Sequence, residues 1–220
     1  AAMAVLMLID IPKPVPAERA DGLKRRLSWR DYICVPALPA ACMLLFNGVT
    51  HASVSNYLSI CGLSRGIEAV GIFFTINSIA MIITRPLCGK LADRKPLIWT
   101  MLPGYALMII AFLLIASAGN IINIVITAVL YGTGFGATQA SIQLWALRRA
   151  GPESRGIANS TFYVGGDLGL SMGAYFAGSI SAFAGYTPMY LLMGCISLCS
   201  ITFFVLFNVF ELRKKKSLHS

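Results

Sequence analysis

Six long apolar runs restrict what this chain can fold into. Each run has 20 residues or more, and about 20 apolar residues cross a bilayer as a helix. The runs are apolar on all sides, whereas strands of a membrane barrel alternate over segments of roughly ten residues. We therefore predict an all-α membrane protein with six transmembrane helices. The expected spans are Tyr32–Leu58, Ala69–Cys88, Leu97–Ala118, Ile121–Leu147, Ile157–Phe183 and Tyr186–Phe210.

Composition excludes several other classes of protein. Charged residues make up 12% of the chain and hydrophobic residues 57%, whereas a soluble domain carries roughly 25% charge. The net charge of +9 could suggest a nucleic-acid partner, but the basic residues lie between apolar runs and not on one folded face, so none is expected. The six cysteines form no CxxC pair, and no His lies at metal-ligand spacing. We expect neither a metal site nor a cofactor.

The remaining sequence divides the chain into four parts. Residues 1–9 are apolar but too short to cross a bilayer, and Asp10 and Pro12 follow where a signal peptide would have its cleavage site. We expect the end of a truncated transmembrane helix there. Residues 10–30 hold three prolines and six basic residues, which predicts a cytoplasmic central linker. Residues 31–210 would form the six-helix domain, and residues 211–220 a basic cytoplasmic tail.

The positions of Lys and Arg predict the orientation of the spans. Counting Arg85 with the connection between the second and third runs, 17 of the 18 basic residues lie in the linker, in alternate connections and in the tail. Arg65 is the exception on the opposite side. Because basic residues favour the cytoplasmic side, we expect a multi-pass protein of the cell membrane with both ends of this segment in the cytoplasm.

One connection carries a recognisable motif. Residues 89–95 (GKLADRK) resemble the G-x-L-a-D-r-x-G-r-k signature of major facilitator superfamily transporters, although Pro96 replaces the second Gly. The resemblance implies a six-helix bundle of two inverted three-helix repeats, which is half of a twelve-helix fold. The other, amino-terminal half would be a partner missing from this sequence. By the same resemblance Gly89, Asp93 and Arg94 belong to a cytoplasmic gate. The alternative is an exposed charged turn.

A second stretch points to export. Residues 155–161 (RGIANST), followed by residues 165–169 (GGDLG), resemble the start of the eleventh helix in efflux-type members of the superfamily. The resemblance implies alternating access, with a small-molecule substrate and protons as partners.

Asp167 is the only acidic residue deep within a predicted span. It lies ten residues into the fifth run, about 15 Å along a helix, where a charged Asp costs at least about 2.5–3.5 kcal/mol. We expect it to be protonated, paired or facing water, and hypothesise a site for proton coupling or for a substrate cation. A structural Asp bonded to a neighbouring helix is the alternative. Tyr163 and Ser171 share its face and would line a cavity.

Other residues of the predicted helices are expected to line a cavity or to pack helices together. The resemblance implies that the first and fourth helices of the repeat pair line the central pathway, and both carry polar faces here. His51 is a second candidate for proton or substrate binding, with interhelical packing as its alternative. Gly165, Gly169 and Gly173 form a small-residue ridge that predicts close packing of the fifth helix. The expected lining residues of the two helices are Asn47, Thr50, Tyr131, Thr138 and Ser141.

Three other functions are alternatives to a proton-coupled exporter. An uptake carrier would have the same architecture. A channel or a structural subunit lacks support, since no segment resembles a re-entrant loop or a charged ring. A rhomboid-like serine protease would use Ser171 within GLSMG (169–173), but its base would have to come from a later span, and His51 lies on an earlier one. We therefore expect a transporter and not an enzyme.

Overall fold

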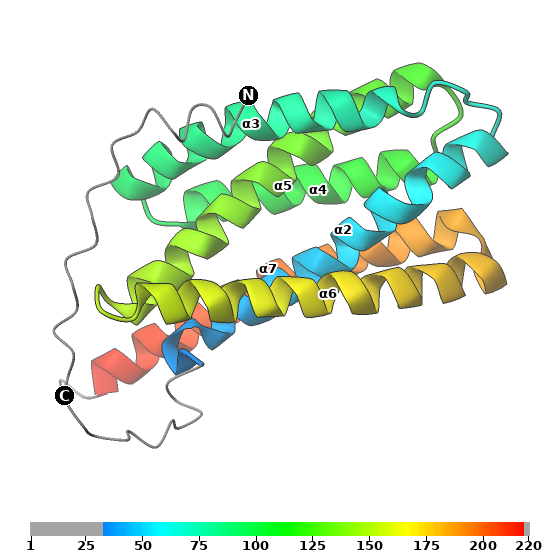
Figure 1. Cartoon of the computed structure of the whole chain (residues 1–220). Helices are drawn as coiled ribbons and strands as arrows, with labels where there is room; N and C mark the ends of the chain where they lie inside the picture. Colours follow the sequence, from blue (N-terminus) through cyan, green and yellow to red (C-terminus); the bar gives the residue numbers. More distant parts are fainter. Residues whose placement is uncertain (1–32, 218–220) are drawn as a thin grey trace, which may run out of the picture.

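The computed structural model describes residues 33–217, with side chains for residues 33–211, and this part of the chain is helical without any strand. The predicted all-α fold is confirmed, while the expected helix end at 1–9 and the linker at 10–30 lie outside the described residues (Figure 1). A short 3-10 helix, η2 (Val35–Ala37), precedes six α-helices. These are α2 (Leu38–Ser64), α3 (Ile72–Arg94), α4 (Ile98–Ala116), α5 (Ile121–Ala150), α6 (Arg155–Ala184) and α7 (Tyr186–Ser217).

The first helix begins and ends about six residues later than predicted. Pro36 and Pro39 lie in the first turns of η2 and α2, where a missing N–H costs nothing, so the chain enters the helix there. At the other end Gly66 has a φ of +76°, and the Ile67 N–H donates to the Gly62 carbonyl at 2.9 Å. This glycine-dependent cap, and not the end of the predicted apolar run, terminates α2.

The motif at 89–95 is mostly helical, which corrects its assignment to a connecting loop. Helix α3 continues through Pro86 to Arg94, so the chain between α3 and α4 is only Lys95–Leu97. Hydropathy suggested an earlier end because the last turns of α3 are polar. Arg85, which the count of basic residues grouped with the connection, lies inside the helix.

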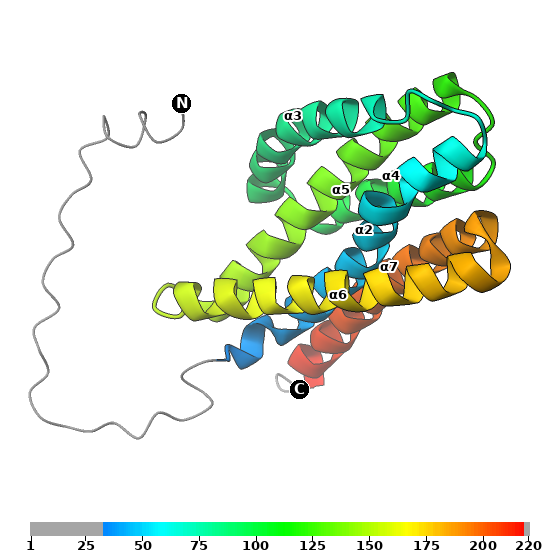
Figure 2. The ribbon, with the colours of Figure 1, turned by 45° about the vertical axis from the view of Figure 1, so that its right-hand side comes forward.

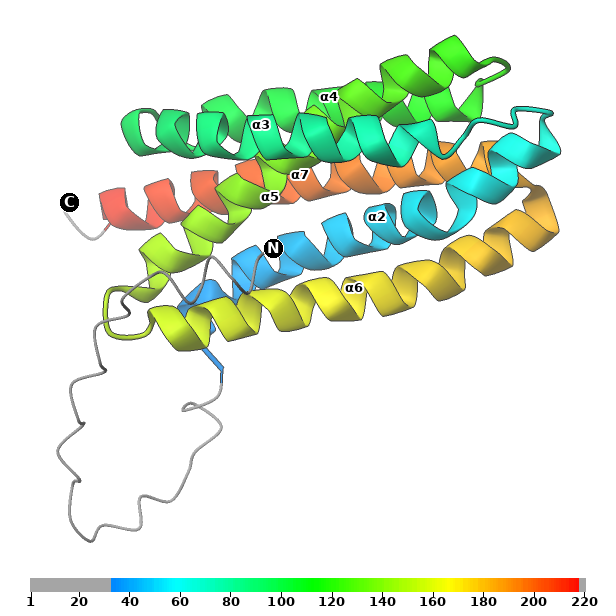
Figure 3. The same ribbon diagram turned by 45° about the horizontal axis from the view of Figure 1, so that its top comes forward.

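The six helices pack as two interlocked sets of three. Helix α2 packs mainly against α6, α3 packs against α5, and α4 contacts both α5 and α7. The α2–α6 and α3–α5 contacts map onto each other when α2, α3 and α4 are exchanged with α5, α6 and α7, and the α4–α5 contact maps onto a smaller one between α2 and α7. Figures 2 and 3 show α2 running beside α6, and α3 beside α5. Aromatic side chains fill the centre, where Tyr105, Phe112 and Tyr131 are fully buried.

Five of these helices are long and apolar enough to cross a membrane, which identifies an integral multi-pass membrane protein. Helix α6 has the length, at 30 residues, but is not among the five. Its glycines and serines, together with Asp167, lower its mean hydropathy. The polar composition of α6 reflects its close packing on α2 and its contribution to the site described below.

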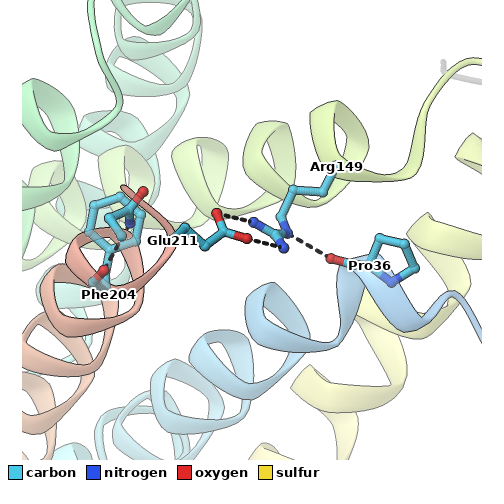
Figure 4. A network of polar contacts seen from close by, with 5 residues as sticks. Pro36, Arg149, Phe204 and Glu211 are labelled. Atoms are coloured by element: carbon cyan, nitrogen blue, oxygen red, sulfur yellow. Dashed lines mark hydrogen bonds and ion pairs between the residues drawn. The ribbon is translucent and has the colours of Figure 1, made fainter. Parts of the chain in front are cut away.

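An arginine holds three helical segments together at the end of the bundle where α5 and α7 terminate. Figure 4 shows Arg149 of α5 between Glu211 of α7 and Pro36 of η2. Both Nη atoms donate to the Glu211 carboxylate at 2.8 Å, and Nε donates to the Pro36 carbonyl oxygen at 2.9 Å. The guanidinium also lies over the ring of Phe207. Such a bidentate pair fixes the orientation of both partners.

Candidate functional site

Polar side chains from four helices meet in one hollow of the bundle, with a volume of ≈ 280 Å³. Helix α2 contributes His51, α3 contributes Arg85, α5 contributes Gln139, and α6 contributes Tyr163 and Asp167. The apolar part of the lining comes from the same four helices and includes Leu44, Met81, Phe135 and Leu170. Asp167, His51 and Tyr163, three of the residues singled out from the sequence, therefore share one site.

Asp167 enters this hollow deep within α6. It lies 12 residues from the first residue of the helix, which is about 18 Å along the axis. Its side chain is exposed on the surface of the six-helix domain, and within the described residues it makes no hydrogen bond or ion pair. The carbonyl oxygen of Asp167 accepts a bond from Ser171 Oγ at 2.9 Å. The carboxylate is thus available to a group outside the bundle.

Arg85 is a functional candidate that the count of basic residues grouped with a connection between helices. It lies nine residues before the end of α3, about 14 Å along the axis, and its Nη2 donates to Gln139 Oε1. No carboxylate of the described residues lies within 4 Å of it. Its position inside the predicted run Ala69–Cys88 was a signal that it belonged to the membrane-spanning helix.

His51 is held in a fixed orientation at the hollow. Its Nδ1 lies 3.0 Å from Tyr131 Oη and its Nε2 lies 3.3 Å from Ser55 Oγ. The ring stacks on Phe135, with centroids 4.3 Å apart and an interplanar angle of 15°. Tyr131 is buried behind His51 and supports the imidazole from inside the domain. The residue has both a packing partner and access to the hollow.

Several residues expected to line a cavity lie between helices instead. Asn47 Nδ2 donates to Thr138 Oγ1 at 3.3 Å, and Ser141 Oγ donates to Thr100 Oγ1 at 2.7 Å. Thr50 Oγ1 donates to the Asn47 carbonyl oxygen. These residues are at most 2% exposed. Because a polar group at membrane depth needs a partner, α2, α4 and α5 pair them with one another and direct them away from the hollow.

The glycine ridge of α6 faces α2. A Cβ added at Gly165 would collide with the carbonyl oxygen of Ala41, and one at Gly169 with that of Leu45. At Gly173 the added atom would lie 2.5 Å from Val49 Cα. The small residues therefore bring the two backbones into contact, and this close approach turns the opposite, polar face of α6 toward the hollow.

The gate candidates lie at the end of α3, where Asp93 pairs within the domain. Its Oδ1 is 3.3 Å from Arg148 Nη2, and the same guanidinium donates to the Ala92 carbonyl oxygen at 2.8 Å. These contacts join α3 to α5. Arg94 is exposed, and Gly89 has open space where a Cβ would be.

The geometry around Ser171 does not match that of a serine protease. Ser171 Oγ donates to a backbone carbonyl of its own helix, while both ring nitrogens of His51 are occupied by Tyr131 and Ser55. Gly169 and Gly173 of the GLSMG sequence serve the contact with α2. His219, the other histidine, lies outside the described residues.

Comparison with known proteins gives one family and two curated relatives. The sequence model of the Major Facilitator Superfamily matches residues 1–174. The staphylopine export protein of Staphylococcus aureus (strain Mu50 / ATCC 700699) is 27% identical over 169 residues, covering 72% of this chain and 41% of that protein. The fosmidomycin resistance protein of Escherichia coli (strain K12) is 29% identical over 113 residues, covering 51% of this chain and 28% of that protein. The chain thus spans less than half the length of either relative.

Proposed function

Because the chain belongs to the Major Facilitator Superfamily, we propose that it forms the carboxy-terminal half of a twelve-helix transporter that exports a small organic compound in exchange for protons. The names of the two relatives, an export protein and a resistance protein, favour export over uptake. The amino-terminal half would cover the exposed faces of α3 and α6 and complete the site.

The observation that carries the proposal is the unpaired Asp167 carboxylate in a hollow at membrane depth. A carboxylate that no neighbouring helix satisfies would be costly in a lipid-filled space. A water-filled pathway that opens alternately to the two sides of the membrane supplies the solvent that it needs. In such a pathway Asp167 binds a proton from the acidic side and releases it on the other side.

The other polar residues of the hollow would support this exchange. His51 lines the same hollow and is the second candidate for binding a proton or the substrate, which would require release of its bond to Tyr131 or to Ser55. At the end of α3, the pair between Asp93 and Arg148 holds α3 against α5. We propose that its rearrangement accompanies opening at that end, together with Gly89 and Arg94.

The proposal is tested with everted membrane vesicles that contain the full-length protein. An acidic lumen is established and monitored with a pH-sensitive dye, and small compounds are added, beginning with fosmidomycin. A transported compound should dissipate the gradient in these vesicles but not in empty ones. Asp167→Asn should abolish this response because an amide binds no proton in the working pH range.

Glu153→Gln provides the matched control, since Glu153 is an exposed carboxylate between α5 and α6. This variant should behave like the unmodified protein. An undiminished response in Asp167→Asn vesicles, at equal amounts of protein in the membrane, would contradict the coupling role.

A further inference from the structure

The hollow holds two opposite charges that do not pair with each other. Arg85 on α3 and Asp167 on α6 both line it, yet within the described residues no nitrogen of one lies within 4 Å of an oxygen of the other. A direct ion pair would satisfy both groups at membrane depth. Their separation leaves each able to receive a charged group from outside the domain.

Arg85 is prepared for a flat or tetrahedral anion. Gln139 Oε1 accepts from one of its nitrogens, and this bond anchors one end of the guanidinium while leaving most of its five N–H donors free. A guanidinium binds a carboxylate, phosphonate or phosphate through two parallel hydrogen bonds, which a lysine cannot reproduce. The chemistry at this side of the hollow therefore selects an anionic group.

Asp167 provides the complementary contact. An ionised carboxylate only accepts hydrogen bonds, so its natural ligand is an ammonium group. The lining of the same hollow also contains Phe135, Met81 and Leu170, and these apolar side chains suit a short hydrocarbon link. The volume of ≈ 280 Å³ is just below the range of about 300–1,000 Å³ for ligand pockets, which restricts the site to a small compound.

We infer that the substrate class is a small bipolar compound, with an anionic group bound by Arg85 and a protonated amine bound by Asp167. This inference rests on the proposed exporter function and adds the class of compound that it carries. A compound of this kind would also explain exchange, because its ammonium group and a proton compete for the same carboxylate. The ionisable groups around Asp167 in the hollow are Arg85 of α3, His51 of α2 and Tyr163 of α6, while α5 contributes the neutral Gln139.

The test measures binding to the purified full-length protein without any pH gradient. Three probes of equal chain length are compared by the shift they cause in melting temperature. They are 3-aminopropylphosphonate, which is bipolar, propylphosphonate, which carries only the anion, and propylamine, which carries only the cation. The bipolar probe should give the largest shift and the tightest binding.

Variants assign the two contacts. Arg85→Gln should weaken binding of the bipolar probe by about tenfold or more, because a charge-assisted pair is lost, and Arg85→Lys should restore it only in part. Asp167→Asn should remove the advantage of the bipolar probe over propylphosphonate. Lys90→Gln, which removes an exposed charge from the same helix, should leave binding unchanged.

Two results would overturn the inference. One is the absence of any shift with 3-aminopropylphosphonate, and the other is a shift with propylamine that equals it and survives Arg85→Gln. Neither result would bear on gradient-driven exchange, which is measured separately in vesicles. Failure of the substrate class is therefore distinguishable from failure of the exporter function.

Discussion

Arg65 is the one basic residue predicted to lie on the side of the membrane opposite to the other Lys and Arg residues. Its two Nη atoms donate to the carbonyl oxygens of Ile115, Ala116 and Ala118 and to Thr187 Oγ1, at 2.7–3.1 Å. The carbonyl ends of α4 carry partial negative charge. The one basic residue that the charge pattern assigns to the opposite side of the membrane is thus bound by the protein itself, and it joins the end of α2 to α4 and α7.

Replacing this side chain should destabilise the domain. Arg65→Gln loses the charged fork that holds the end of α4, and hydrogen bonds to charged groups contribute about 1.5–3 kcal/mol. Thermal unfolding of the purified protein in detergent should show a lower melting temperature, and Arg65→Lys should recover only part of the loss. Arg155→Gln, at the exposed start of α6, serves as the control. Equal melting temperatures for Arg65→Gln and this control would contradict the bracing role.

At the scale of helices, the contact between α2 and α6 depends on the absence of side chains. Three glycines of α6 lie against backbone atoms of α2. From the other side, a Cβ added at Gly48 of α2 would lie 2.6 Å from the Gly166 carbonyl oxygen. Two helices this close fix each other's rotation. The rotation of α6 in turn determines that Asp167 and Tyr163 face the hollow.

A single methyl group should disturb this pair of helices. Gly169→Ala places a Cβ against the Leu45 carbonyl oxygen, and overpacking of this kind costs about 1–3 kcal/mol. We expect a lower melting temperature and weaker dissipation of the pH gradient. Gly156→Ala in the same helix has open space around the new methyl group and should be neutral or slightly stabilising. A Gly169→Ala protein with unchanged melting temperature and transport would contradict this prediction, because it would show that α2 and α6 can move apart without loss of stability or activity.

At the scale of the whole molecule, the basic residues predict a definite orientation in the membrane. The connection between α2 and α3 should face the outside, and the connection between α5 and α6 should face the cytoplasm. Glu68 and Glu153, both exposed, mark these two sides.

Cysteine labelling checks this orientation. In a background with all native cysteines replaced by serine, Glu68→Cys should react with a membrane-impermeant maleimide in intact cells. Glu153→Cys should react only after the cells are permeabilised. The reverse pattern would invert the topology and, with it, the direction of the proposed export.

Much of the architecture followed from local properties of the sequence. Apolar runs of at least 20 residues form helices in a membrane, because every backbone N–H and C=O group must be hydrogen-bonded within its own segment. The small-residue ridge of α6 and the depth of Asp167 were also readable, since helical periodicity places residues three or four apart on one face. The ends of α2 and α3 were harder to predict, because hydropathy does not detect helix caps or polar helical turns.

The sequence by itself determined that this protein is an all-α membrane protein of the Major Facilitator Superfamily, and it singled out Asp167. Only the tertiary structure decided which polar side chains meet. It paired Asn47 with Thr138 and Ser141 with Thr100 inside the bundle, and it brought Arg85 to the hollow of Asp167. The physical reason is that helix rotation and crossing depend on contacts between segments far apart in the chain, which the periodicity of a single helix does not contain.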